Sequence, residues 1–169
     1  SAAVCNDVSE DCMGEAFFKR ISLIGRYSDL EPSVTFWRDV MGFEYAGAPT
    51  SPMSPAVSAL GYDESARSYF TKFTSPSGVM VGLVMIEDAP EFPKIDLPKS
   101  GAYGAVVLIH EAKGIQEIDE RAATHGTEVL RPLNQTTNET GITTSAMHLI
   151  APTGHIVALY ESDALPEKD

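Results

Sequence analysis

Two stretches of the chain, SPSGVMVGLVMIE (residues 75–87) and APTGHIVALYE (residues 151–161), share one pattern. Each begins with a small residue, a proline, a polar residue and a glycine, and continues as an apolar run that ends at a glutamate. Pro and Gly in this arrangement favour a tight turn, and the apolar run favours a strand. Two occurrences of the same hairpin pattern predict that the chain contains an internal duplication.

The residues around each hairpin predict the same order of elements in both halves. A strand is followed by a helix that ends at a glycine, and three further strands follow. We expect strands at 17–28, 43–47, 68–74 and 79–87, and again at 102–110, 127–131, 142–150 and 155–161. We expect helices at 29–41 and 112–125, and a polar loop at 132–141. The predicted fold is therefore α+β, built from two βαβββ modules.

The module boundaries follow from changes in composition. Proline-rich segments separate the periodic stretches, and acidic segments flank them. The predicted parts are an acidic N-terminal extension (1–16), the first module (17–88), a linker (89–101), the second module (102–161) and an acidic tail (162–169). A further irregular segment at 48–67 is expected to cover part of a site as a lid.

The composition excludes two classes of partner. The 169 residues carry a net charge of −12, and no cluster of Lys and Arg supplies the positive field that nucleic acids require. No apolar run approaches the ~18 residues needed to cross a bilayer. We therefore expect neither nucleic-acid binding nor a membrane-spanning role.

The two cysteines, Cys5 and Cys12, both lie in the acidic N-terminal extension. In an oxidising compartment their close spacing would allow a disulfide, and two exposed thiols are the alternative. The opening residues SAAV suit a chain from which an export signal has been removed, and the remnant of a tag would look the same. Export to the periplasm is slightly favoured over the cytoplasm.

The predicted modules, with SDLEPSVTFWRDVMGFE (28–44) after the first strand and a PxG hairpin before the last, resemble the vicinal oxygen chelate superfamily. This family contains glyoxalase I, extradiol dioxygenases and bleomycin- and fosfomycin-resistance proteins. The resemblance covers residues 18–161. It implies that the strands of the two modules form a curved mixed sheet around a cup. It also implies a homodimer, in some members with modules exchanged between chains.

The resemblance also implies where a metal ion would be held. Metal-dependent members use four ligands, usually His, Glu or Gln, one from the first and one from the last strand of each module. The matching positions here are Ser22, Gly82, Gly104 (Tyr103 if the register slips by one) and Ala158. Glycine and alanine side chains offer no lone pair to a cation. We therefore expect neither a metal ion nor another cofactor.

Alternation along the strands predicts which side chains face the cup. If Phe73 and Leu149 pack beneath the helices, Lys72 and His148 take equivalent positions on the other face. The predicted lining is apolar, with small residues and a few cationic groups, which suits a hydrophobic or aromatic small molecule carrying an anionic group. The expected lining residues are Arg20, Ser22, Ile24, Arg26, Phe70, Lys72, Met80, Gly82, Val84, Gly104, Val106, Leu108, Ala146, His148, Ile150, Ile156, Ala158 and Tyr160.

Three functions remain open at this stage. The leading hypothesis is a metal-free protein that binds a hydrophobic or aromatic small molecule in the cup. The second is a glyoxalase-like lyase, isomerase or dioxygenase, in which His148, Lys72 or Tyr160 would act as acid or base. The third is a protein with a filled cup that only binds other proteins. A strand histidine without an adjacent acidic residue is more often a pocket residue than a catalyst, which favours the first hypothesis.

Overall fold

The computed structural model describes residues 20–49, 67–87, 97 and 105–163. Several features expected from the sequence lie outside this part of the chain. They are Cys5 and Cys12, most of the segment 48–67, most of the linker 89–101, the tail from 164, and Tyr103 with Gly104.

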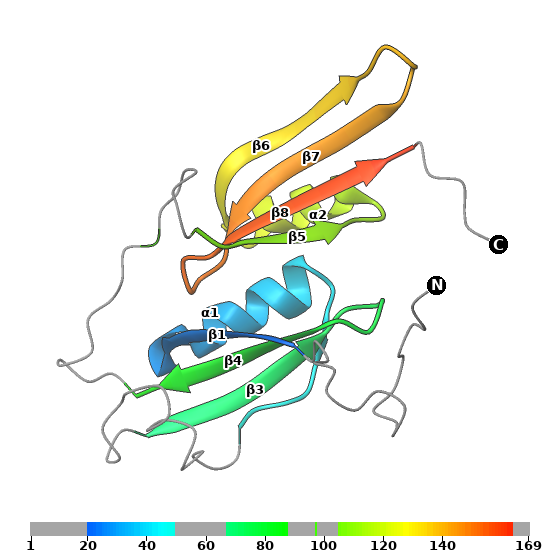
Figure 1. The fold of residues 1–169 in the computed structure, drawn as a ribbon. Coiled ribbons are helices and arrows are strands. Elements are labelled where there is room, and N and C mark those ends of the chain that lie inside the picture. The colour runs from blue at the N-terminus through cyan, green and yellow to red at the C-terminus, as the bar shows by residue number, and fades with distance from the viewer. Residues whose placement is uncertain (1–19, 50–66, 88–96, 98–104, 164–169) are drawn as a thin grey trace, which may run out of the picture.

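The first module is one four-stranded sheet with a helical segment after its first strand (Figure 1). The strand order is β1-β4-β3-β2, with β1 parallel to β4 and the other neighbours antiparallel. In chain order the elements are β1 (Ile21–Arg26), a 3-10 turn (Tyr27–Asp29), α1 (Leu30–Val34), a π-helical turn (Thr35–Val40), β2 (Glu44–Tyr45), β3 (Ser68–Thr74) and β4 (Met80–Ile86).

The second module repeats this topology. Its sheet has the order β5-β8-β7-β6, and again only the pairing of the first strand with the last is parallel. Its elements are β5 (Val107–Glu111), α2 (Ile115–Thr124), β6 (Glu128–Thr137), β7 (Thr143–Ile150) and β8 (Ile156–Ser162). The prediction of two βαβββ modules with mixed sheets is confirmed. None of the helices in the described part is long and apolar enough to cross a membrane.

The two hairpins with the PxG pattern, at 75–87 and 151–161, adopt the same turn. In the first, the amide of Gly78 donates to the carbonyl of Ser75, and in the second Gly154 donates in the same way to Ala151. Both glycines have a left-handed backbone, with φ of 88° and 91°. An L-residue avoids this conformation, so the glycine in each PxG pattern is required by the turn.

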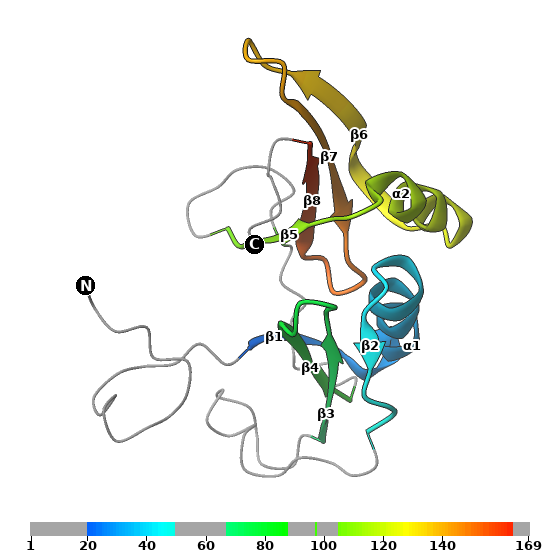
Figure 2. The same cartoon turned by 90° about the vertical axis from the view of Figure 1, so that its right-hand side faces the viewer.

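Both helical segments lie on the same side of the two sheets and meet each other where the modules join (Figure 2). Phe73 and Leu149 are fully buried on this side, as predicted. Ile115, Ile118 and Ala122 form the buried face of α2. One hydrophobic core contains residues from both modules, so the halves are stabilised together.

The first helical segment differs from the continuous α-helix that the sequence predicts. From Thr35 to Val40 it is π-helical, and the amide of Met41 donates to the carbonyl of Phe36 at 2.9 Å, five residues back. The wider turn accompanies burial of the adjacent side chains Phe36 and Trp37, which are 2% and 0% exposed. Sequence periodicity at 3.6 residues per turn does not anticipate this widening.

The strand β6 is longer than predicted. The expected loop at 132–141 was wrong in its first half, because β6 continues to Thr137 and pairs with β7 to form a projecting arm (Figures 1 and 2). Pro132 is tolerated because β6 lies at the edge of the sheet and its pairing with β7 shifts register nearby. The turn at the tip is closed by Asn138, whose side-chain oxygen accepts from the amides of Thr140 and Ile142.

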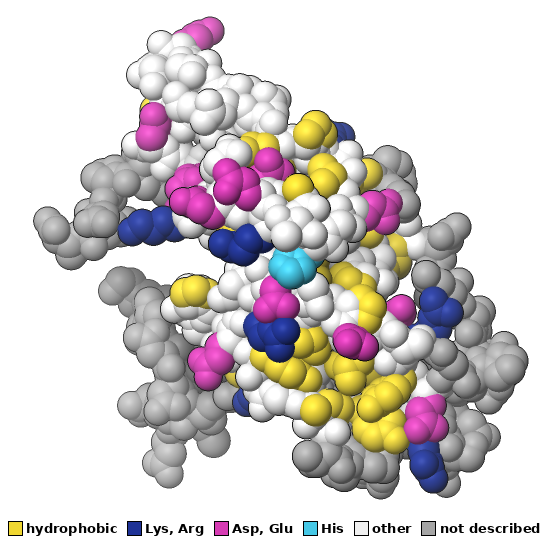
Figure 3. All heavy atoms as spheres, turned by 180° about the vertical axis from the view of Figure 1, so that it is seen from behind, with side chains coloured by type: hydrophobic (Ala, Val, Ile, Leu, Met, Phe, Trp, Pro, Cys, Tyr) yellow, Lys and Arg dark blue, Asp and Glu magenta, His cyan; other side chains and the backbone are white. Residues whose placement is uncertain are grey.

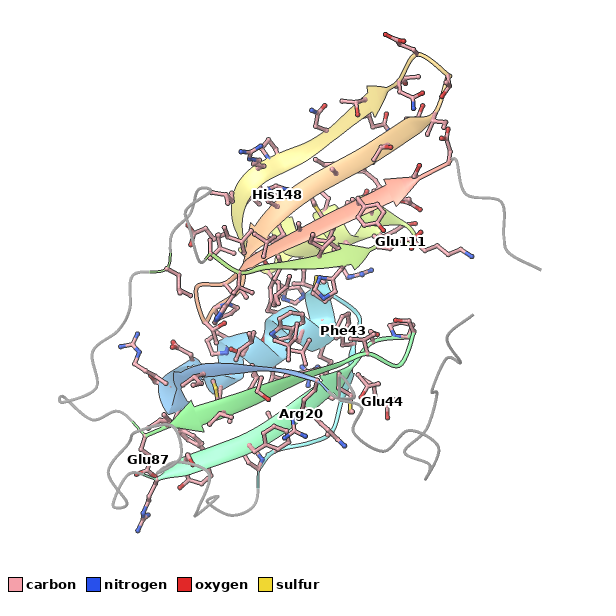
Figure 4. The ribbon with its side chains drawn as sticks, in the orientation of Figure 1. Arg20, Phe43, Glu44, Glu87, Glu111 and His148 are labelled. Carbon is pink, nitrogen blue, oxygen red and sulfur yellow. The ribbon has the colours of Figure 1, made fainter. Side chains whose placement is uncertain are left out.

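Side chains from both modules meet at the junction. The His110 ring lies 5.9 Å from the Trp37 ring and 5.7 Å from the Phe43 ring, measured between centroids. Burial in this position lowers the pKa of His110 below its ordinary value. Arg121 on α2 donates from Nε to the carbonyl of Val40 at 3.0 Å. The junction is therefore packed and hydrogen-bonded, and Phe43 lies within it (Figure 4).

Candidate functional site

The candidate site is the face of each sheet that carries no helix. On the first sheet, the register places Ser22, Gly82 and Lys72 side by side in one row across β1, β4 and β3. The next row contains Ile24, Val84 and Phe70. These are the rows that alternation predicted for the cup, because the residues between them, such as Leu23 and Leu83, belong to the core.

An arginine and an aromatic ring meet over Gly82. The Arg20 guanidinium carbon lies 4.6 Å from the centroid of the Phe70 ring, and Arg20 Nε donates to Ser22 Oγ at 3.3 Å. A Cβ atom added at Gly82 would lie 2.8 Å from both Phe70 Cε2 and Ser22 Oγ. The missing side chain at residue 82 is therefore what allows the ring to occupy this position.

The equivalent row of the second sheet contains Ile109, Ala158 and His148 across β5, β8 and β7. Lys72 pairs with Gly82 as His148 pairs with Ala158, so the predicted equivalence of Lys72 and His148 is confirmed. Figure 4 shows Arg20 and His148 on the two different sheets.

The predicted phase of the first strand of this module was wrong. Leu108 is 4% exposed and belongs to the core, whereas Val107 and Ile109 lie on the helix-free face. Ile109, and not Gly104, occupies the register position of Ser22. The helix starts at Ile115, three residues later than expected, and Ile109 lies two residues closer to its helix than Ser22 does. Together these shifts move the position by five residues, an odd number, so the strand shows its other face, which is the phase of the alternative register at Tyr103.

The remaining predicted residues are distributed as follows. Val106, expected on the cup face, precedes β5 and is 61% exposed. Met80 lies at the start of β4 on the helix-free side of the first sheet, and Tyr160 lies beside Ala146 and Glu111 on that of the second. Arg131 pairs with His148 and was not predicted for the site. It was expected to be the last residue of its strand, immediately before a polar loop.

The residues at the family's metal positions do not fit a metal ion. Ser22 offers a hydroxyl that already accepts from Arg20, and Gly82, Ile109 and Ala158 offer no donor atom. Among the described residues, no group of three or more His, Cys, Asp or Glu side chains could hold a cation. The phenyl ring of Phe70 covers the position at Gly82.

Arg20 and Lys72 lie on the helix-free face of the first sheet, and the register also places the carboxylate of Glu44 on this face, in the row through Thr74 and Met80. No carboxylate of the described residues lies within 4 Å of Arg20 or Lys72, although the chain as a whole is strongly acidic. On the opposite, helix-bearing side, acidic side chains gather over the second module (Figure 3), where α2 contributes Glu117, Asp119 and Glu120.

The side chain of His148 has neither a hydrogen bond nor an ion pair to any other described residue. A general base needs a group that fixes its tautomer and ring orientation. The arrangement around His148 in the described residues therefore supports contact with a ligand better than proton transfer.

A separate cleft of about 640 Å³ lies on the helix-bearing side, between α1, the end of α2 and the turn from β7 to β8. Its walls combine apolar residues such as Phe36 and Ile150 with the polar side chains of Thr35, Glu31 and His125. Of the described residues predicted for the cup, Ile150 is the one that lines this cleft instead.

Comparison with known proteins agrees with this architecture. A glyoxalase family protein from Bacillus cereus superposes with a TM-score of 0.70 at 16% identity, covering 89% of this chain and 97% of that one. A glyoxylase/bleomycin resistance protein/dioxygenase domain from Frankia sp. gives 0.58 at 11% identity, covering 89% and 94%. A fosfomycin resistance protein from Listeria monocytogenes, complexed with Mn(II) and sulfate, gives 0.50 at 14% identity, covering 87% and 93%.

A search of curated protein sequences found no significant match. The family model of the glyoxalase/bleomycin resistance protein/dioxygenase superfamily matches residues 22–159, which is most of the chain and both modules. At the identities given above, the structural likeness shows the fold alone, and the family model adds the sequence pattern. The chain therefore belongs to the glyoxalase/bleomycin resistance protein/dioxygenase superfamily.

Proposed function

We propose that this protein binds a hydrophobic or aromatic small molecule on the helix-free faces of its sheets, without a metal ion. The observation that carries the proposal is the set of residues at the metal positions, of which only Ser22 has a donor atom. Small residues at Gly82 and Ala158 leave room, and Ile24, Val107 and Ile109 offer apolar surface. Burial of apolar ligand surface would contribute ~25 cal/mol per Å².

Metal analysis tests the first half of this proposal. Protein purified without chelator should contain far less than one equivalent of Ni, Zn, Fe or Mn, and treatment with a chelator should leave its Tm unchanged. A stoichiometric metal ion whose removal lowers the Tm would contradict the proposal.

A ligand screen tests the second half. Aromatic compounds that bind the native state should raise the Tm with increasing concentration. Compounds recovered from the protein should have unchanged mass. A change in mass would favour the competing hypothesis of a metal-free lyase or isomerase that uses His148, Lys72 or Tyr160.

We also propose that a second copy of the chain covers these faces in a homodimer. Exposed apolar side chains gather around the two edge strands β1 and β5: Ile109 is 70% exposed, Val106 61%, and Ile24 and Val107 41% each. Contiguous apolar surface of this kind is typical of an interface. Because both faces belong to the candidate site, a partner module over either face would enclose the ligand.

Light scattering during size-exclusion chromatography tests the dimer. The native protein should elute as a dimer, and Ile109→Asp should shift it toward the monomer without unfolding it, because residue 109 is exposed in the single chain. Val79→Asp, on the exposed turn before β4, is the matched control and should remain dimeric. A monomeric native protein would overturn the dimer and leave the small-molecule site to be tested separately.

A further inference from the structure

We infer that Arg20, held over Gly82 by Phe70 and Ser22, is an anion-binding group that replaces the family's metal ion in the first module. The inference rests on the proposed small-molecule site and specifies its ligand as an aromatic or other planar compound with an oxyanion: a carboxylate, sulfonate, phosphonate or phenolate.

The position of the Arg20 guanidinium matches that of the family's metal ion in this module. Ser22 and Gly82 occupy the two places in this module from which metal-dependent relatives hold a cation, and they are register partners on adjacent parallel strands. The Arg20 guanidinium lies over the same spot, because it contacts both Ser22 and the Phe70 ring that leans across Gly82. A positive charge is therefore present where relatives carry one, although it comes from a side chain.

A second feature is the geometry of the guanidinium. Arginine has five N–H donors in a planar fork. In Arg20, Nε donates to Ser22 Oγ, and the guanidinium carbon lies over the Phe70 ring; both contacts restrict the rotation of the side chain. The two terminal nitrogens have no partner among the described residues. An arginine fixed in this way offers a bidentate site to an oxyanion at a small cost in entropy.

A third feature is its surroundings. Ser22 and Lys72 are the register partners of Gly82 on its two neighbouring strands. At the usual spacing of strands, the backbones at Ser22 and Lys72 are roughly 10 Å apart, so Lys72 supplies a second cation for the same anion. No carboxylate of the described residues lies within 4 Å of either group. The half-buried Phe70 ring and the exposed Ile24 offer an apolar surface beside the charge. This combination favours a ligand that is both aromatic and anionic over a purely apolar one.

The test uses two fluorescent probes with one aromatic frame. 8-Anilino-1-naphthalenesulfonate carries an oxyanion, and N-phenyl-1-naphthylamine is its neutral counterpart. Arg20→Gln should weaken binding of the sulfonate by about tenfold or more, the usual effect of losing a charge-assisted hydrogen bond, and should change binding of the neutral probe by less than about twofold. Added salt should weaken sulfonate binding to the native protein more than to the variant.

Two further variants separate the position of Arg20 from its charge. Gly82→Ala places a methyl group 2.8 Å from the Phe70 ring and should displace it, so sulfonate binding should weaken although every charge remains. Phe70→Leu should have the same effect by removing the ring. Arg38→Gln is the control, since Arg38 pairs with Asp39 outside the candidate site. It should bind both probes as the native protein does.

Equal effects of Arg20→Gln on both probes, or none on either, would overturn the inference and leave the proposed small-molecule site intact. Failure of both probes to bind the native protein would overturn the proposed function together with the inference.

Discussion

The carboxylate of Glu161 ties the last strand to the start of α2, and its replacement by glutamine should destabilise the protein. Glu161 accepts hydrogen bonds from the backbone amides of Gly114 and Ile115, both at 2.8 Å, from a position 46 or 47 residues away in the chain. These amides are at the N-terminus of a helix, where they have no partner within the helix and where negative charge is favoured. The two bonds lower the pKa of Glu161.

The expected loss for Glu161→Gln is about 2 kcal/mol. A carboxylate accepts from both amides, whereas the glutamine side chain accepts from one and turns its NH2 group toward the other. Hydrogen bonds to a charged group contribute ~1.5–3 kcal/mol and neutral ones ~0.5–1.5 kcal/mol, and the N-terminal position adds ~0.3–1 kcal/mol. For a chain of this size, 2 kcal/mol corresponds to a fall in Tm of roughly 4–8 °C.

The pH dependence gives a sharper test. Because the folded-state pKa of Glu161 is lowered, its contribution to stability is fully present above the ordinary pKa of glutamate and is lost as the pH falls through the folded-state value. The native protein and Glu161→Gln should therefore differ most near pH 7. They should converge only when the pH falls below the lowered folded-state pKa of Glu161, where both side chains are neutral.

Urea unfolding followed by fluorescence measures this difference. The chain has one tryptophan, Trp37, which is 0% exposed, so its emission should shift to longer wavelength on unfolding. Glu120→Gln, on the exposed side of α2, is the matched control and should change stability by less than about 0.5 kcal/mol. A difference between the native protein and Glu161→Gln that does not shrink as the pH falls below the ordinary pKa of glutamate would refute the assignment to the carboxylate.

Three further predictions concern the duplicated scaffold and the junction. Gly78→Ala and Gly154→Ala should each cost about 1–2 kcal/mol in urea unfolding, because both glycines have φ near +90°, and an alanine at either position without cost would show that the turn is not strained. Leu149→Ala should cost about 2–5 kcal/mol, since its side chain is fully buried, and a loss below 1 kcal/mol would place it outside the core. Arg121→Met should lower the free energy of unfolding by about 1–3 kcal/mol, because the carbonyl of Val40 loses its donor, and Arg121→Lys should restore only part of this stability. An unchanged urea midpoint in Arg121→Met would show that this bond does not stabilise the junction.

The features predicted best from the sequence are those fixed by local chemistry. Three such features were predicted correctly: the PxG turns, the glycines that end both helical segments, and the buried face of α2. Each depends on residue type directly, because a left-handed backbone favours glycine and a buried helix face requires apolar residues at helical spacing. The equivalence of Lys72 and His148 followed from the expectation that Phe73 and Leu149 pack beneath the helices, since alternation along a strand then places their neighbours on the other face.

The features predicted poorly depend on contacts between distant segments. The phase of β5 was misjudged because its pairing with β8 is set across the sheet, and no tight turn connects the two strands. The full length of β6 was missed because an edge strand of polar residues has no apolar alternation to reveal it. The stack of Arg20 on Phe70 also could not be read from the chain, since the contact depends on the empty position at Gly82 between them.

The residues where the family places its ion decide what the site can do. A metal shell needs donor atoms from both modules at once, so the loss of donors in either one is sufficient to abolish it. Here the row through Gly82 combines an aromatic ring with positive charge, and the row through Ala158 contains Ile109 and no donor at the family's positions. The row through Ala158 also contains His148 and Arg131, so both modules combine apolar and basic side chains in the row where the family places its ion.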